Sequence, residues 1–210
     1  QPFAQEDYIT KQVHIDSNPG ASCPVFLAYL SHILEGDQDM IDFIQRAMGY
    51  SLTGSTEEHC VFILHGSGRN GKSTLINVLM DLLGELAKSV EPEVLTIRRH
   101  NNNTLVEMAD LAGARLVTAV ETEENKSLAE AKIKQMSGGD VVKGCLKYKH
   151  PFDFWPVWKL WYATNHKPTI RGTDEGIWSR IRLIPFNVFI PKANRDKKLG
   201  EKLKAERRNP

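Results

Sequence analysis

Hydrophobic residues follow two patterns along the chain: short continuous runs and runs with helical spacing. The continuous runs are typical of buried strands and occupy residues 60–64, 115–120, 158–163 and 181–186. Apolar positions three and four residues apart predict amphipathic helices over residues 24–34, 40–48, 75–83, 105–111 and 128–136. Because strands and helices alternate after residue 60, the chain predicts an α/β fold, a three-layer α/β/α sandwich with a mainly parallel sheet.

The same pattern divides the chain into three parts. Residues 1–50 hold a polar lead-in and two helices, which we interpret as a small N-terminal helical collar. Ser22 is expected to cap the first of these helices, and Gly49 to end the second. Residues 51–192 form the core, and residues 193–210 form a charged C-terminal helical tail.

Charge is distributed unevenly between the parts. Residues 1–60 carry two Lys/Arg and nine Asp/Glu, a net charge of −7, so the remainder carries +8 in a chain with a formal net charge of +1. A basic segment of this size suits a polyanionic partner, although a solvated surface gives the same composition.

Cysteine use and hydropathy narrow the class of protein. Cys23, Cys60 and Cys145 lie far apart and form no metal-ligand or CxxC pattern, which favours a reducing compartment and buried thiols. The sequence has no apolar run long enough to span a bilayer, and its first residues do not have the pattern of a signal peptide. A cytoplasmic protein without a membrane partner is expected.

A glycine-rich loop lies between the first apolar run and the helix at 75–83. Gly66, Gly71, Lys72 and Ser73 satisfy G-x-x-x-x-G-K-[ST], the phosphate-binding loop, in which backbone N–H groups and a helix N-terminus point at phosphates. Lys72 would reach the β- and γ-phosphates of ATP, and Ser73 would ligate Mg²⁺. The candidate nucleotide-binding residues are Gly66, Ser67, Gly68, Arg69, Asn70, Gly71, Lys72, Ser73 and Thr74.

Acidic residues follow the apolar run at 115–120. A nucleotide hydrolase needs an acid beside Mg²⁺ and a group that orients the attacking water. We assign Glu121 to the Mg²⁺ shell and Glu123 to the water, with Glu124 as the alternative for the second role. A solvated loop is the structural alternative for the whole cluster.

Two further residues complete the predicted catalytic set. Asn165 follows the apolar run at 158–163, where its amide could position the γ-phosphate or the water; a turn asparagine is the alternative. Arg180, with Arg182 two residues later, flanks the start of the last apolar run, and an arginine there could act in trans on the nucleotide of a neighbouring subunit, as an arginine finger does. Without an oligomer, either arginine would be a surface or salt-bridge residue.

Residues 140–155 alternate apolar and polar positions and predict a hairpin rich in lysine. Lys143, Lys147 and Lys149 lie in it together with Tyr148. Lysines with an aromatic side chain can hold the phosphate backbone of single-stranded DNA and stack on a base, although lysines at a hairpin tip also serve solubility.

Together these segments resemble superfamily 3 helicases, and in particular the helicase domain of phage and plasmid primase-helicases related to the poxvirus primase-helicase. The segments that carry the resemblance are 66–74, 117–124, 134–140, 160–168 and 171–185. The resemblance implies an AAA+-like ATPase that uses ATP and Mg²⁺. By position, Glu121 and Glu123 fall on motif B, Asn165 matches the sensor asparagine of motif C, and Arg180 matches the arginine finger.

The resemblance also implies partners. It places Lys147 and Lys149 on a central-channel DNA-binding loop of a ring, typically a hexamer, that moves 3′ to 5′ on single-stranded DNA. It further implies a primase portion elsewhere in a longer chain and a virus, phage or plasmid as the source. Two other functions stay open: a monomeric phosphotransferase acting on a small molecule, and a non-catalytic nucleotide-binding scaffold.

Overall fold

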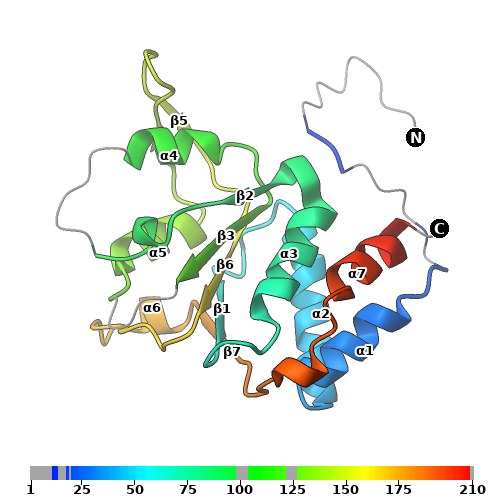
Figure 1. Cartoon of the computed structure of the whole chain (residues 1–210). Coiled ribbons are helices and arrows are strands. Elements are labelled where there is room, and N and C mark those ends of the chain that lie inside the picture. The colour runs from blue at the N-terminus through cyan, green and yellow to red at the C-terminus, as the bar shows by residue number, and fades with distance from the viewer. Residues whose placement is uncertain (1–10, 14–17, 19, 98–103, 122–126, 209–210) are drawn as a thin grey trace.

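A five-stranded sheet forms the centre of the computed structural model, which describes residues 11–13, 18, 20–97, 104–121 and 127–208 (Figure 1). Its strands, in spatial order, are β2 (Ala87–Ser89), β3 (Leu116–Glu121), β6 (Lys159–Thr164), β1 (Val61–His65) and β7 (Ile181–Pro185). All of these neighbours pair in parallel. The predicted parallel sheet is confirmed, with β2 added at one edge, where the short sequence Ala-Lys-Ser has no apolar run.

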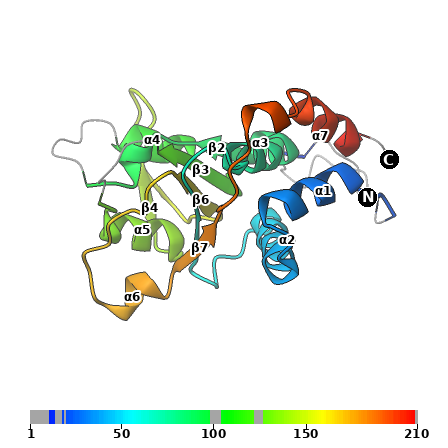
Figure 2. The same cartoon turned by 60° about the horizontal axis from the view of Figure 1, so that its bottom comes forward.

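Helices cover both faces of the sheet, as the sandwich requires (Figure 2). One face carries α1 (Pro24–Ile33), α2 (Gln38–Leu52), α3 (Lys72–Leu83) and α7 (Leu199–Arg208). The other carries α4 (Thr104–Asp110), α5 (Glu130–Ser137) and α6 (Glu175–Trp178). The 3₁₀ turns η2 (Gly84–Leu86), η3 (Pro92–Val94) and η4 (Lys192–Asn194) lie in the connections.

Side chains of the central strands alternate between two hydrophobic clusters, one on each face. In β1, Phe62 and Leu64 face α1, α2 and α3, whereas Val61 and Ile63 face α4 and α5. This alternation is the period-two geometry of a strand, and burial on both faces explains why the strand sequence is a continuous apolar run. The hydrophobic core therefore lies on both faces of the sheet, between its strands and the covering helices.

The second helix extends past its predicted end. We expected Gly49 to stop it, but α2 continues to Leu52. Ser51 is fully buried, and its hydroxyl accepts a 2.9 Å hydrogen bond from the indole of Trp161 in β6. This tertiary contact holds the last turn of α2 against the sheet, which offsets the low helix propensity of glycine.

The first helix is capped by the last helix. The N-cap residue is Cys23, not Ser22, and its side chain makes no capping bond. The carboxylate of Glu206 in α7 instead accepts the N–H groups of Val25 and Phe26 at 2.7 and 2.8 Å. A carboxylate at a helix N-terminus satisfies otherwise unpaired donors and interacts favourably with the positive end of the helix dipole. The leading and trailing helices are thus held together.

Candidate nucleotide-binding site

The glycine loop connects the carboxyl end of β1 to the first residue of α3, as the motif predicts. Gly68 and Gly71 have φ angles of +90° and +94°, in the left-handed region that favours glycine. At Gly66 a Cβ atom would lie 2.1 Å from the carbonyl oxygen of Phe186, so no larger residue fits without displacing the backbone. The loop is therefore a tight turn that leaves a helix N-terminus facing outward from the sheet edge.

Lys72 is buried at the centre of this loop, with 5% of its surface exposed. Its Nζ donates to the carbonyl of Gly66 at 2.6 Å and to the side-chain oxygens of Asn70 at 3.0 Å and Asn165 at 3.3 Å. Among the described residues these partners are all neutral, and burial lowers the pKa of Lys72 to about 8. A buried cation held only by neutral oxygens is suited to an anionic ligand.

A pocket of about 340 Å³ opens beside Lys72. The residues after the lysine, Ser73 and Thr74, line it from the first turn of α3, and Val120, Thr164 and Asn165 line it from the ends of β3 and β6. Ligands of open parallel sheets bind at the carboxyl ends of the strands. The structure thus brings the loop and Asn165 together at one site, as the sequence predicted.

Of the acidic candidates, the structure describes only Glu121, whose backbone lies at the same edge of the sheet. Glu121 is the last residue of β3; its backbone pairs in register with Thr164, which in turn pairs with His65 directly before the loop. The backbone of Glu121 is therefore two strands from the phosphate loop, about 10 Å by strand spacing. Glu123 and its alternative, Glu124, lie outside the described residues, so the division of roles stays a prediction.

Two supports of the loop had no signal in the sequence. The amide of Asn70 donates to the carbonyl of Phe186 at 2.9 Å, which ties the loop to the end of β7. The hydroxyl of Tyr29 in α1 donates to the carbonyl of Gly71 at 2.8 Å. Helical periodicity placed the first helix on the core, but nothing in the chain indicated that it touches the loop.

Arg180 lies at the opposite end of the sheet. It directly precedes β7, and its carbonyl accepts a 2.8 Å hydrogen bond from the N–H of Val61, the first residue of β1. The length of β1 therefore separates its backbone from the glycine loop, about 16 Å at the rise of a strand. The structure does not bring Arg180 to the pocket of its own chain.

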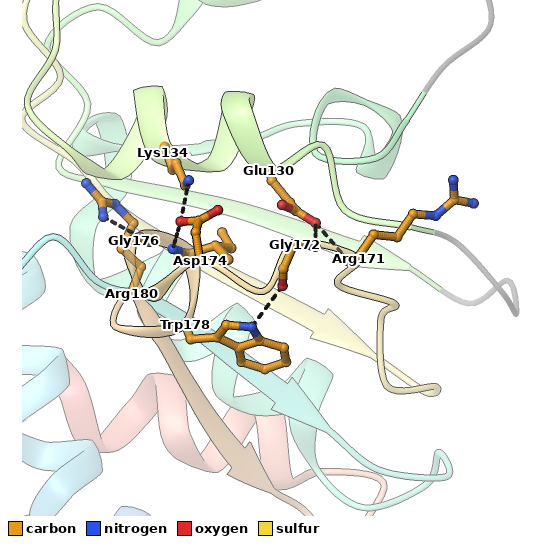
Figure 3. Close-up of polar contacts among 9 residues, drawn as sticks. Glu130, Lys134, Arg171, Gly172, Asp174, Gly176, Trp178 and Arg180 are labelled. Carbon is orange, nitrogen blue, oxygen red and sulfur yellow. Dashed lines mark hydrogen bonds and ion pairs between the residues drawn. The ribbon is translucent and has the colours of Figure 1, made fainter.

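A network of polar contacts shapes the turn that carries Arg180 (Figure 3). Glu130 accepts the backbone N–H groups of Arg171 at 2.8 Å and Gly172 at 2.7 Å. Lys134 pairs with Asp174 at 2.7 Å, and Asp174 in turn caps the N-terminus of α6. These contacts fasten the turn to α5, while the side chain of Arg171 extends away from it (Figure 3).

The guanidinium of Arg180 is half-buried at the end of α6. Its Nη1 donates to the carbonyl of Gly176 in the preceding turn (Figure 3). Its Nε is buried and has no hydrogen-bond partner among the described residues. One guanidinium donor group is thus held in place, while another lacks an acceptor in the part of the chain that the structure describes.

The lysine-rich hairpin is confirmed as β4 (Val142–Gly144) paired antiparallel with β5 (Phe152–Phe154), and it projects beyond α4 (Figure 1). Lys143 lies opposite Asp153, with its Nζ 3.9 Å from the carboxylate. Lys147 lies 5.1 Å from the ring centroid of Tyr148, which is 94% exposed. Lys147, Tyr148 and Lys149 lie between these two strands and form the tip of the hairpin.

Comparison with known protein families identifies one that matches more than half of the chain. Residues 64–180, from the last residues of β1 to Arg180, match the family described as "Family of unknown function (DUF5906)". The chain belongs to this family. The match includes the glycine loop, Glu121, the hairpin and Asn165.

Relatives of the chain occur in viruses. It is 32% identical over 168 residues to "Putative helicase L207/L206" of Acanthamoeba polyphaga mimivirus, covering 79% of this chain and 18% of that protein. It is 27% identical over 165 residues to "Putative helicase 022R" of Frog virus 3, covering 76% of this chain and 17% of that protein. The chain thus spans less than a fifth of the length of these two relatives.

Solved structures share the fold. The apo structure of the NrS-1 C terminal region superimposes with a TM-score of 0.69 at 12% identity, over 91% of this chain and 45% of that one. A second apo structure of that region gives a TM-score of 0.65 over 91% of this chain and 46% of that one.

In the described part of this chain, every helix is too short or too polar to cross a bilayer.

Proposed function

We propose that the chain is the ATP-hydrolysing core of a DNA helicase that belongs to a virus or another mobile element and acts in the cytoplasm of its host. The observation that carries this proposal is Lys72, which is buried at the centre of the glycine loop and has only neutral hydrogen-bond partners among the described residues. A triphosphate would supply an anionic partner for the ammonium group of this lysine. The names of the viral relatives support the helicase assignment.

The residues of the pocket fit a nucleotide triphosphate. The N–H groups at the start of α3 and the ammonium of Lys72 would hold the β- and γ-phosphates. Because Oδ1 of Asn165 accepts from Lys72, its Nδ2 is the group available to donate to the γ-phosphate. Ser73 and Glu121 would hold Mg²⁺, and Glu123 would orient the attacking water. Bound Mg²⁺ would neutralise the charge that develops on the phosphates.

The finer assignment is to superfamily 3, with an AAA+-like ring, typically a hexamer, moving 3′ to 5′ on single-stranded DNA. In such a ring Arg180 of one subunit would complete the pocket of its neighbour, and Lys147 and Lys149 would contact the DNA strand. Lys143 is the weaker of the three lysine candidates because Asp153 lies beside it. A primase portion would belong to the same longer protein.

Replacing Lys72 tests the proposal. We expect Lys72→Ala to lower DNA-stimulated ATP hydrolysis at least about 100-fold, because one preorganised charge at the phosphates is removed. Lys198→Ala, which removes an exposed lysine outside the site, serves as the control and should keep wild-type turnover. Phosphate release is measured with and without single-stranded DNA. Equal rates in Lys72→Ala and wild type would contradict the proposed site.

A further inference from the structure

The hydroxyl of Tyr29 reaches the phosphate loop from α1. Tyr29 is 6% exposed, and its hydroxyl donates to the carbonyl oxygen of Gly71, the residue directly before Lys72, at 2.8 Å. Burial raises the pKa of this hydroxyl, so it stays protonated and remains a donor at every working pH. A residue 42 positions before Gly71 thus contacts the last peptide group of the loop.

The geometry of a peptide bond gives this contact its meaning. In a trans peptide the C=O and N–H groups point in opposite directions. The carbonyl of Gly71 accepts from Tyr29 and also from the N–H of Leu75, which belongs to α3. With the carbonyl held from two sides, the N–H of Lys72 is turned away from α1, and Gly71 and Lys72 both line the nucleotide pocket. This N–H is one of the donors that a phosphate would meet.

The packing around Gly71 leaves the loop little freedom relative to α1. A Cβ atom at Gly71 would lie 2.7 Å from Cγ2 of Ile33 and 3.3 Å from the hydroxyl of Tyr29. Ile33 is fully buried one turn beyond Tyr29, on the same side of α1. Any shift of the Gly71 backbone toward α1 must therefore move the helix.

The helix α1 is itself held at its start. Glu206 of α7 caps its first turn, and the neighbouring Arg207 donates to the carbonyl of Asp81 near the end of α3. Lys204 adds an ion pair to the carboxylate of Asp81 at 3.0 Å. The helices α1, α7 and α3 form a closed set of contacts, with the phosphate loop at the junction of α1 and α3.

We propose that Tyr29 is a positioning residue, which keeps the peptide between Gly71 and Lys72 in its phosphate-binding orientation and so couples nucleotide binding to the docking of α1. The inference rests on the proposed nucleotide site. Because coupling is reciprocal, a nucleotide that needs this orientation also stabilises α1 in its place.

The test removes one oxygen atom. Tyr29→Phe keeps the ring and its packing and deletes the hydroxyl. Tyr50→Phe is the matched control, since its hydroxyl also makes one hydrogen bond to the backbone, in this case by accepting from the N–H of Glu58 at 3.2 Å, but lies at the far end of α2. Binding of Mg²⁺ and a non-hydrolysable ATP analogue is measured by calorimetry, and thermal stability is measured on the same samples.

We expect Tyr29→Phe to weaken binding about fivefold, the effect of one hydrogen bond, while Tyr50→Phe binds as wild type does. The two variants should melt at similar temperatures. Equal affinity in the two variants overturns the positioning role. Binding by wild type that is lost in Lys72→Ala keeps the nucleotide site in either case, whereas no binding by wild type overturns both proposals.

Hydrogen exchange on the wild-type protein supplies a second measurement that needs no variant. With the nucleotide analogue bound, the amides of α1 from Tyr29 to Ile33 should exchange more slowly, whereas those of α2 should change little. Protection of the phosphate loop without protection of α1 would contradict the coupling. This result stands even if Tyr29→Phe does not fold.

Discussion

At the scale of single residues, the chemistry of the site depends on a lysine that has lost most of its contact with water. Burial disfavours the ammonium form of Lys72 and lowers its pKa to about 8, while neutral oxygens of Gly66, Asn70 and Asn165 hold it in place. An incoming phosphate favours the charged form and raises that pKa again. Nucleotide binding is therefore linked to proton uptake.

This linkage predicts a pH dependence. Below pH 8 Lys72 is already protonated in the free protein, so affinity should be flat. Above pH 8 the free protein has lost this proton and must take one up on binding, so affinity should fall by up to about tenfold per pH unit. Burial and nearby positive charges lower the pKa of His65, which stays neutral across this range.

Calorimetry between about pH 7.5 and pH 9.5, in buffers with different ionisation enthalpies, measures both the affinity and the protons taken up. Lys72→Arg is the control because a guanidinium stays charged throughout. A wild-type affinity that is constant above pH 8, with no proton uptake, would show that Lys72 is charged before the nucleotide arrives.

Residue patterns predicted the local part of this site and missed its long-range part. The glycine motif identifies the loop because it encodes a backbone shape within a few residues, and Asn165 was found because it follows a buried strand. Tyr29 and Phe186 contact the loop from 42 and 116 residues away in sequence. Periodicity indicates that such residues are buried, but not which backbone group they meet.

At the scale of elements, hydrophobic patterns located the strands, whereas helix ends, which also depend on tertiary contacts, were predicted less well. Continuous apolar runs located β1, β3, β6 and β7 because strands of a covered parallel sheet are buried on both faces. Helix ends were less predictable: Ser22 is a good capping residue, yet Glu206 from a distant helix caps α1. The edge strand β2 pairs with β3, but its own sequence has little hydrophobic signal.

The hairpin of β4 and β5 is the element whose function is tested most directly. Lys147→Ala combined with Lys149→Ala should weaken single-stranded DNA binding and lower the slope of log affinity against log salt by about 1.4, since each lost phosphate contact contributes about 0.7. Lys143→Ala should change the slope less, because Asp153 already opposes that charge. Salt titrations of fluorescent DNA measure the slopes, and equal slopes in all three proteins would exclude the tip from the DNA interface.

At the scale of the whole molecule, the two ends of the sheet carry different parts of the proposed machinery. The glycine loop lies at the carboxyl ends of the strands, and Arg180 precedes the amino end of β7. Within one chain these groups cannot meet. A ring of identical subunits would solve this, since the Arg180 turn of one copy could face the pocket of the next.

Mixing two inactive variants tests this arrangement. Arg180→Ala should lose at least about 10³-fold in turnover while keeping its pocket, and Lys72→Ala should lose its pocket while keeping Arg180. A mixture of the two should recover measurable ATP hydrolysis, because a pocket from one variant meets an arginine from the other. Mixtures that stay as inactive as their components, although they co-assemble, would contradict action in trans.

The carboxylate of Glu206 has a practical consequence for anyone who shortens this chain. A version of the chain that stops before α7 would still contain the whole family match, which ends at residue 180. It would nevertheless expose the unpaired donors at the start of α1 and loosen the helix on which the phosphate loop rests. Weak ATP turnover by such a version would therefore result from the loosened helix α1 and not from a catalytic site that lacks activity.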